Sequence, residues 1–425
     1  MIIHNIETLN EAELQAMCIR SNYESASVSH IIDEVKAGGD SAVRKLTFKH
    51  DRVLLQDFKV TDEAIIAATN RIPDNVKSAY EQAAMNIRSF HELKKTSNTV
   101  LETMPGVNCH TETRPIERVG LYVPGGSAPL PSTALMLGIP AAIAGCEEVC
   151  VVTPPEKNTI YSDIILYAAQ LCGIRDIYTV GGPMAIAALA YGTESIPKVD
   201  KIFGPGNKYV TAAKMQVSTD PEGAAIDIPA GPTEVLVIAD ESARADFVAS
   251  DLLAQAEHGP TSQSILVCTN EDKTKEILEE VERQRISLSR KDDINGALDN
   301  SYALVVNSTL EAISFANRYA PEHLILNTLD ADTLAMKVNN AGSVFIGEYS
   351  CESAGDYASG PNHCLPTLGY ARVVGGVSLR SFQKQITFQK VTAEGAKILA
   401  PIVSIMAEQE GLDGHRRAME IRVEN

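Results

Sequence analysis

Residues 117–154, ERVGLYVPGGSAPLPSTALMLGIPAAIAGCEEVCVVTP, contain the pattern that decides the fold. A short β-rich run, VGLYVP, is followed by a glycine turn, a helical run rich in alanine and leucine, and a second β-rich run, EEVCVVTP. Strand, turn and helix repeated in this order are typical of a parallel sheet that carries helices on both faces. The stretch therefore predicts an α/β fold.

The alternation continues through IRDIYTV and KVDKIFG, and a second alternation begins after AAIDIPAGPTE. Its candidate strands are EVLVIAD, QSILVCTN, YALVVNS, LILNT and GSVFIGE. Because the break falls near Gly231 and Pro232, we place a domain boundary there. The sequence predicts two Rossmann-like parallel-sheet domains with small helical N- and C-terminal segments.

These patterns divide the chain into four expected parts. Residues 73–90 carry apolar side chains at helical spacing, among them Val76, Tyr80 and Ile87, and the tail also has helical periodicity. We expect an N-terminal segment at 1–20 and a helical tail at 381–425. The first α/β domain is expected to combine residues 21–118 with 233–380, and the second to span 119–232.

Composition and charge narrow the function classes. The formal net charge is -18, and an acidic surface repels phosphate, so neither a nucleic-acid nor a membrane partner is expected. The start, MIIHNIETLNEAELQ, lacks the features of a signal peptide, and the apolar runs are too short to span a bilayer. Eight cysteines occur without a C-x-x-C pair, which is typical of reduced thiols. We expect a cytoplasmic protein.

Three predicted strands run into glycine turns: Gly125-Gly126, Gly181-Gly182 and FGPGN at 203–207. Where such a turn opens a helix, its free N–H groups can bind a pyrophosphate. However, the G-x-G-x-x-G pattern of a dinucleotide site is incomplete. From these turns alone, a nucleotide site and plain strand-to-helix connections both remain open.

Polar residues of the second half form two further patterns. Gln255 and His258 lie three apart at the end of the helical run DLLAQAEHGP, and Asp356 lies in SAGDYASGPN. Imidazole, carboxylate and amide ligands without thiolates suit Zn²⁺ in an open site, although helix capping or a surface role explains each residue equally well. For Glu322 and His323, in PEHL, two interpretations remain open. They are groups that transfer protons near neutral pH, or they are an ordinary surface pair.

Six segments together resemble the histidinol dehydrogenase family over nearly the whole chain. They are VGLYVPGGSAPLPSTALML, KVDKIFGPGNKYV, GAAIDIPAGPTEVLVIAD, DFVASDLLAQAEHGP, APEHLI and ESAGDYASGPNHCLPT. The resemblance implies NAD-dependent, four-electron oxidation of L-histidinol to L-histidine through a bound aldehyde, in histidine biosynthesis. It also implies a homodimer whose active site is shared between subunits.

The resemblance also assigns residues. One Zn²⁺ per subunit would be held by Gln255, His258, Asp356 and His415, the last supplied by the partner's tail. Substrate contacts would come from these four residues together with Thr233, His323, His363 and Glu410. The metal and catalytic residues fall mainly in the first expected α/β domain, and the NAD site in the second.

Chemistry then implies the catalytic roles. Oxidation of an alcohol needs a base for its hydroxyl proton, and the family's candidate is His323. The aldehyde must be hydrated before it is oxidised, and Glu322 would deprotonate the attacking water. NAD would lie against Tyr122, Met184 and Asn207. Met184 departs from the family, which commonly has Gln at that position, and this puts that cofactor contact in doubt. Thr233 replaces a usual Ser and keeps the hydroxyl.

Two other function classes compete with this interpretation. A cysteine-dependent aldehyde dehydrogenase would use Cys351 or Cys364 as its nucleophile, which requires an exposed, activated thiolate. A two-lobed binding protein would capture a metal-chelated imidazole ligand without turning it over.

Overall fold

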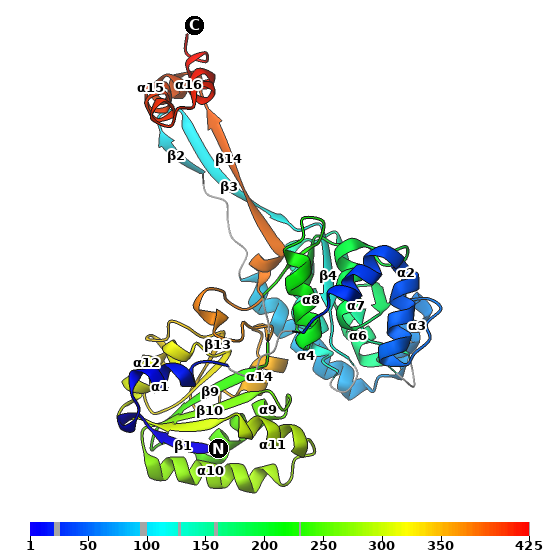
Figure 1. Cartoon of the computed structure of the whole chain (residues 1–425), viewed down its shortest axis with the longest axis vertical. Coiled ribbons are helices and arrows are strands. Elements are labelled where there is room, and N and C mark those ends of the chain that lie inside the picture. The colour runs from blue at the N-terminus through cyan, green and yellow to red at the C-terminus, as the bar shows by residue number, and fades with distance from the viewer. Residues whose placement is uncertain (21–25, 94–99, 126–128, 157–159, 229–230, 425) are drawn as a thin grey trace.

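A computed structural model describes residues 1–20, 26–93, 100–125, 129–156, 160–228 and 231–424. The chain forms two α/β lobes, each built around a parallel sheet, and a long arm that projects from them and ends in the C-terminal helices (Figure 1). The α/β class and the two parallel sheets were predicted, and the structure confirms them. No helix in the described ranges is long and apolar enough to cross a membrane.

The first lobe is built on a six-stranded parallel sheet, ordered β1-β11-β10-β9-β12-β13. Its strands are β1 (Ile2–Asn5), β9 (Glu234–Ala239), β10 (Gln263–Cys268), β11 (Tyr302–Val305), β12 (His323–Asn327) and β13 (Ser343–Ile346). All six residues of β9 are buried, because helices cover both faces of the sheet.

Alternate β9 side chains define the two faces of this sheet. Val235 and Val237 pack with α9 (Ala245–Ala256), α10 (Glu271–Arg285) and α11 (Lys291–Asp299). Leu236 and Ile238 pack with α1 (Glu11–Met17), α12 (Thr309–Tyr319) and α13 (Ala331–Ala335). The short α14 (Glu352–Tyr357) lies beside α9.

The second lobe is built on a five-stranded parallel sheet, ordered β6-β5-β4-β7-β8. Its strands are β4 (Arg118–Tyr122), β5 (Glu148–Thr153), β6 (Asp176–Thr179), β7 (Lys201–Phe203) and β8 (Ala225–Ile226). One face packs against α3 (Asp62–Arg71), α4 (Asp74–Glu92), α5 (Ser132–Ala144) and α6 (Asp163–Leu171). The other packs against α2 (Ser29–Asp51), α7 (Gly182–Tyr191) and α8 (Lys208–Ser218).

The arm is a three-stranded antiparallel sheet, ordered β14-β3-β2. It consists of β2 (Val100–Met104), β3 (Val107–Pro115) and β14 (Gln383–Val391), and it carries α15 (Ala393–Gln409) and α16 (Asp413–Glu420) at its tip. The 3-10 turn at Leu379–Phe382 leads directly into β14, and two others lie at Ile6–Thr8, between β1 and α1, and at Tyr370–Arg372.

The packing differs from the expected division of the chain. Residues 21–118 were expected to join the lobe of 233–380, but α2, α3 and α4 pack on the sheet of 118–226 instead, and 100–115 belong to the arm. Residues 1–20 are not separate, because β1 pairs with β11. The tail is not purely helical, since it begins with β14. The apolar face of an amphipathic helix indicates that the helix packs on another element, but it does not specify which sheet that is.

The two sheets face each other with opposite ends of their strands. In the second lobe, β4 and β7 are neighbours although β5 and β6 lie between them in sequence, so ligand binding is expected at their carboxyl ends. In the first lobe, β9 and β12 are the corresponding neighbours. There the polar residues Thr233, Glu322 and His323 lie at the amino ends of the strands.

Gly204 follows β7 with φ +123°, and a Cβ there would lie 2.1 Å from the carbonyl oxygen of Tyr122. We expect Gly204→Ala to lower the free energy of unfolding by about 3 kcal/mol, through backbone strain and this collision. Gly145→Ala is the control, because Gly145 has φ +84° but open space around it; its strain alone should cost about 1 kcal/mol. Equal losses in urea unfolding would show that the turn can move away from Tyr122.

Candidate active site

A pocket lies where the carboxyl ends of β4 and β7 face the amino ends of β9 and β12. Its lining includes Gly204, Gly206 and Asp227 from the second lobe and Thr233, His258, Glu322, Asp356 and His363 from the first. An adjoining pocket is lined by Tyr122, Gly125, Asn207 and Lys208 and shares Thr233 and His258 with the first. The structure therefore brings most of the sequence-predicted site residues together in one place.

Glu322 and His323 stand at the start of β12, and both are buried. The Glu322 carboxylate accepts a hydrogen bond from the Thr233 hydroxyl and another from the backbone N–H of Glu234, at 3.1 Å. His323 Nδ1 lies 3.3 Å from the backbone carbonyl oxygen of Glu234. Because a carbonyl can only accept, Nδ1 carries a hydrogen, and Nε2 is the nitrogen left for chemistry.

His258 and Asp356 approach each other from two helices. His258 follows the end of α9 with its side chain about a third exposed, at 35%, and its Nε2 lies 3.9 Å from Asp356 Oδ2 on α14. Glu352, one helical turn before Asp356, lies 4.0 Å from the same nitrogen through Oε1. One ligand atom each from His258, Glu352 and Asp356 lie within 4.8 Å of one another.

Gln255, at the end of α9, lies on the buried side of this group. The amide orientation that suits its neighbours directs the NH2 group to Glu352 Oε1 and the oxygen to Thr233 Oγ1, each at 3.0 Å. Gln255 therefore connects Glu352 with Thr233.

The side chains of this group have the chemistry of a metal site. The nearby donors are imidazole, carboxylate and amide groups without a thiolate, which suits zinc or a similar ion with positions left open for substrate. The residues present therefore fit a zinc ion.

Electrostatics support the same conclusion. Burial raises the pKa of Glu322 to about 7 and that of Glu352 well above its usual value. Burial disfavours a charged imidazole, but the carboxylates of Glu352, Glu322 and Asp356 raise the pKa of His323 to about 10. Excess negative charge thus surrounds one buried imidazole, and a cation would offset it.

Two of the predicted site residues lie far from this pocket in the single chain. His415 is on α16 and Glu410 ends α15, so both are at the tip of the arm, and both are exposed (Figure 1). The fourth predicted metal ligand therefore does not come from the same chain in this structure.

The predicted cofactor residues divide into two groups. Tyr122 and Asn207 flank the junction between β4 and β7, where Asn207 caps α8 by accepting from the backbone N–H of Tyr209 and of Val210. Met184 is 1% exposed in the apolar core behind them and does not line either pocket. Gly126, of the first glycine turn, is outside the described residues.

His363 and the two cysteines bear on the remaining expectations. His363 Nδ1 donates to the backbone carbonyl of Asp356, at 2.8 Å, and its Nε2 lies 3.1 Å from Thr133 Oγ1. Cys364 is buried, and burial raises the pKa of its thiol well above the usual range. This is the opposite of an activated nucleophile. Cys351 is the residue before α14 and is partly exposed.

Two residues of the site were not identified from the sequence. Glu352 precedes Asp356 by four residues, a spacing that places both on one face of a helix, and this signal could have found it. Glu234 holds both Glu322 and His323 through its backbone, and backbone contacts leave no side-chain signal in a sequence.

Comparisons with known proteins agree with one another. The profile of the histidinol dehydrogenase family matches residues 18–423. Histidinol dehydrogenase of Vibrio vulnificus (strain CMCP6) is 52% identical over 419 residues, covering 98% of this chain and 96% of that protein. The enzyme of Escherichia coli (strain K12) is 51% identical over 397 residues, covering 93% and 91%. The crystal structure of histidinol dehydrogenase from Elizabethkingia anophelis superposes with a TM-score of 0.96 at 47% identity, covering 100% of this chain and 98% of that one.

Asp251, on α9 one turn before Gln255, offers a test of the buried charge. Burial raises the pKa of its carboxyl to about 7, so the folded protein keeps a proton that the unfolded chain has released, and stability falls as pH rises from about 4 to 7. In chelator-treated protein, Asp251→Asn should unfold at higher urea than wild type at pH 8 and at the same urea at pH 4.

The control is Asp246→Asn on the same helix, where Arg244 lowers the pKa of the carboxyl. That substitution should give no gain at pH 8. A gain for both variants, or for neither, would contradict the buried position of Asp251.

Proposed function

Because the chain belongs to the histidinol dehydrogenase family, we propose that it uses zinc and NAD to oxidise L-histidinol to L-histidine by four electrons, through a bound L-histidinaldehyde. It is an oxidoreductase of histidine biosynthesis. The observation that carries the finer proposal is the meeting of His258, Asp356 and Glu322 in one pocket, with His323 buried directly behind Asp356. The reaction consumes one water, whose oxygen enters the product carboxylate.

Gln255, His258 and Asp356 would hold the zinc ion from this chain. Glu352 lies close enough to act as a further ligand or as the hydrogen-bond acceptor that orients Gln255. When bound, the ion would hold the amino and imidazole nitrogens of the substrate and offset the charge of the surrounding carboxylates, so that the pKa of His323 falls toward neutrality.

His323 would act as the base in the oxidation of the alcohol. Its Nδ1 is held by the backbone carbonyl of Glu234, and its Nε2 lies 3.5 Å from Oδ1 of Asp356, which lines the pocket. Nε2 would take the hydroxyl proton as hydride leaves the adjacent carbon. The contact with Glu234 keeps the imidazole in the tautomer that this step requires.

Glu322 would act as the base in the oxidation of the aldehyde. Burial brings its pKa to about 7, so at neutral pH the carboxyl exchanges protons readily. Thr233 and the backbone of Glu234 hold one carboxylate oxygen, which leaves the other to remove a proton from the attacking water.

Two NAD⁺ molecules would bind in turn in the adjoining pocket, against Tyr122 and Asn207, and each would accept one hydride. Support comes from the position of this pocket at the carboxyl ends of β4 and β7, where open parallel sheets bind nucleotides. The buried Met184 would support the Tyr122 wall from behind rather than provide a polar contact.

A second copy of this chain would complete the site. The arm exposes many large apolar side chains, which a lone chain in water would not favour. They are Val100, Leu101, Ile386, Phe388, Val391, Ile398, Ile402, Ile405, Met406, Leu412 and Ile421. In a homodimer the arm would bury these against its partner and bring His415 and Glu410 to the partner's pocket.

A reducing, cytoplasmic compartment is part of the proposal. All eight cysteines are unpaired, as expected where disulfides do not persist.

The central test is the electron count. Wild-type enzyme should form two NADH for each L-histidinol consumed, because the aldehyde stays bound and is oxidised in turn, and removal of metal with a chelator should abolish turnover until zinc is restored. NADH absorbance and product analysis measure both. One NADH per histidinol with release of aldehyde would reject the four-electron proposal, and full activity without metal would reject zinc.

The shared site can be tested by mixing two inactive variants, His258→Asn and His415→Ala. After subunit exchange, a heterodimer has one site with both defects and one with neither, so about a quarter of wild-type activity should return. Mixing His258→Asn with Asp356→Asn is the control, since both defects lie in the body of the chain and no site is intact. No recovery in the first mixture, with exchange confirmed, would place His415 in its own chain's site.

A further inference from the structure

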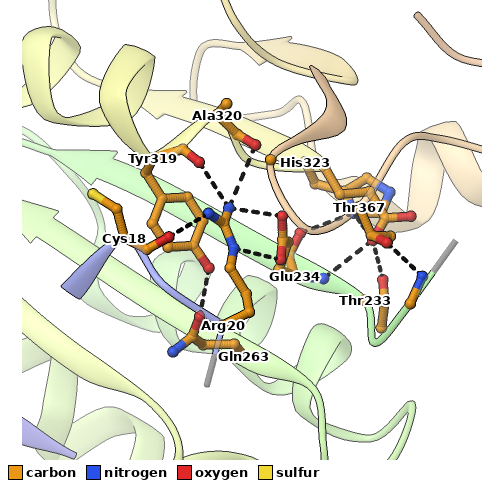
Figure 2. Close-up of polar contacts among 12 residues, drawn as sticks. Cys18, Arg20, Thr233, Glu234, Gln263, Tyr319, Ala320, His323 and Thr367 are labelled. Atoms are coloured by element: carbon orange, nitrogen blue, oxygen red, sulfur yellow. Dashed lines mark hydrogen bonds and ion pairs between the residues drawn. The ribbon is translucent and has the colours of Figure 1, made fainter. Parts of the chain in front are cut away.

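Behind the active site lies a buried ion pair that joins the N-terminal segment to β9. The Arg20 guanidinium, 10% exposed, donates from Nε to Glu234 Oε2 at 3.0 Å and from Nη2 to Glu234 Oε1 at 2.9 Å (Figure 2). It lies over the ring of Tyr319, 3.6 Å from the ring centre. This forked geometry is specific to arginine and fixes the carboxylate in both position and orientation.

The same guanidinium also holds the turn that leads into β12. Nη2 donates to the backbone carbonyl of Tyr319 at 2.8 Å, with Ala320 O further away at 3.4 Å. Ala320 has φ +54°, a left-handed conformation that costs free energy in a residue other than glycine. Glu322 and His323 follow within three residues, so Arg20 contacts the segment from which both catalytic candidates project.

Glu234 is the second link between Arg20 and the catalytic pair. Its backbone N–H donates to the Glu322 carboxylate at 3.1 Å, and its backbone carbonyl accepts from His323 Nδ1 at 3.3 Å. Glu234 is also the first residue of β9 and follows the irregular segment that contains Thr233. Its backbone is therefore at a strand end that pairs with Gln263 of β10, and its side chain adds the ion pair with Arg20 to this end.

We propose that Arg20 is a positioning residue for the Glu322–His323 pair. It would act through the Glu234 carboxylate and the Tyr319–Ala320 carbonyls, which lie on the two strand ends that hold these bases. Because Arg20 reaches these bases through other groups, it is not a catalytic residue. The inference rests on the proposed function, because it assigns Arg20 to the reaction of those two bases.

A purely structural role predicts a different behaviour. Buried ion pairs often contribute little to stability and can be replaced by apolar side chains without loss of the fold. If Arg20 only fills the core, Arg20→Met/Glu234→Met should keep the turnover number of the wild type. If Arg20 positions the bases, the double variant should fold and still turn over slowly, because an error of about 1 Å in catalytic geometry costs up to roughly 100-fold.

The experiment measures kcat, KM for L-histidinol, zinc content and urea unfolding for Arg20→Met, Arg20→Lys and Arg20→Met/Glu234→Met. We expect kcat to fall roughly 10- to 100-fold in both variants that carry Arg20→Met, with zinc content and KM within about twofold of wild type, since the metal ligands lie on other elements. Arg20→Lys keeps the charge and loses the fork, so it should recover part of the loss. Both oxidation steps should slow, because Glu234 holds both bases.

Leu304→Ala is the matched control. Leu304 is buried on β11 in the same core face as Tyr319 and contacts no catalytic candidate, so this variant should lose stability and keep kcat. The inference is overturned if the Arg20 variants lose no more activity than Leu304→Ala, or lose zinc and activity together. Should Arg20→Met fail to fold, a wild-type kcat in Arg20→Lys would also overturn it. If the wild-type enzyme forms no NADH from histidinol in the kcat measurement, the proposed function is rejected instead.

Discussion

The site depends on one electrostatic constraint, the crowding of three carboxyl groups around a buried imidazole. Glu352 and Glu322 approach His323 Nδ1 at 3.9 and 3.8 Å, and Asp356 approaches Nε2 at 3.5 Å. Burying so many acidic groups is costly unless a positive charge is present. The raised pKa of His323 is a sign of this imbalance. The cation proposed between the end of α9 and the face of α14 would offset it.

The arrangement of the two sheets explains how such a site can face a dinucleotide pocket. One lobe presents the carboxyl ends of its strands, where glycine turns such as Gly204 lie close to the neighbouring strand. The other presents the amino ends of β9 and β12, where polar side chains and free backbone groups are available. Each lobe therefore contributes different groups from its strand ends, and the proposed reaction would take place between the two lobes.

The lobes hold the site in a fixed geometry, whereas the arm extends away from them. Glu322 and His323 lie at the start of β12, which pairs with β9, and both strands are fully buried. Arg20 contacts the ends of both strands, so the geometry of the pair is set by the core. The arm contacts its own lobes mainly at its base and exposes apolar side chains along its length (Figure 1). This arrangement suits a segment whose partner is another molecule, and it explains why one chain holds only part of the predicted ligand set.

The sequence by itself determined the α/β class and the succession along the chain of β4 to β7 and of β9 to β13, because hydrophobic periodicity is a local property. It did not reveal β1, β8 or the three strands of the arm. It did not determine that α2, α3 and α4 pack on the sheet of 118–226, since the sequence of an amphipathic helix does not specify which sheet the helix packs on. It also did not reveal Glu352 or the role of Glu234. Only the tertiary structure decided those, because the negative charge around His323 and the backbone contacts of Glu234 arise when segments far apart in sequence are brought within a few ångströms.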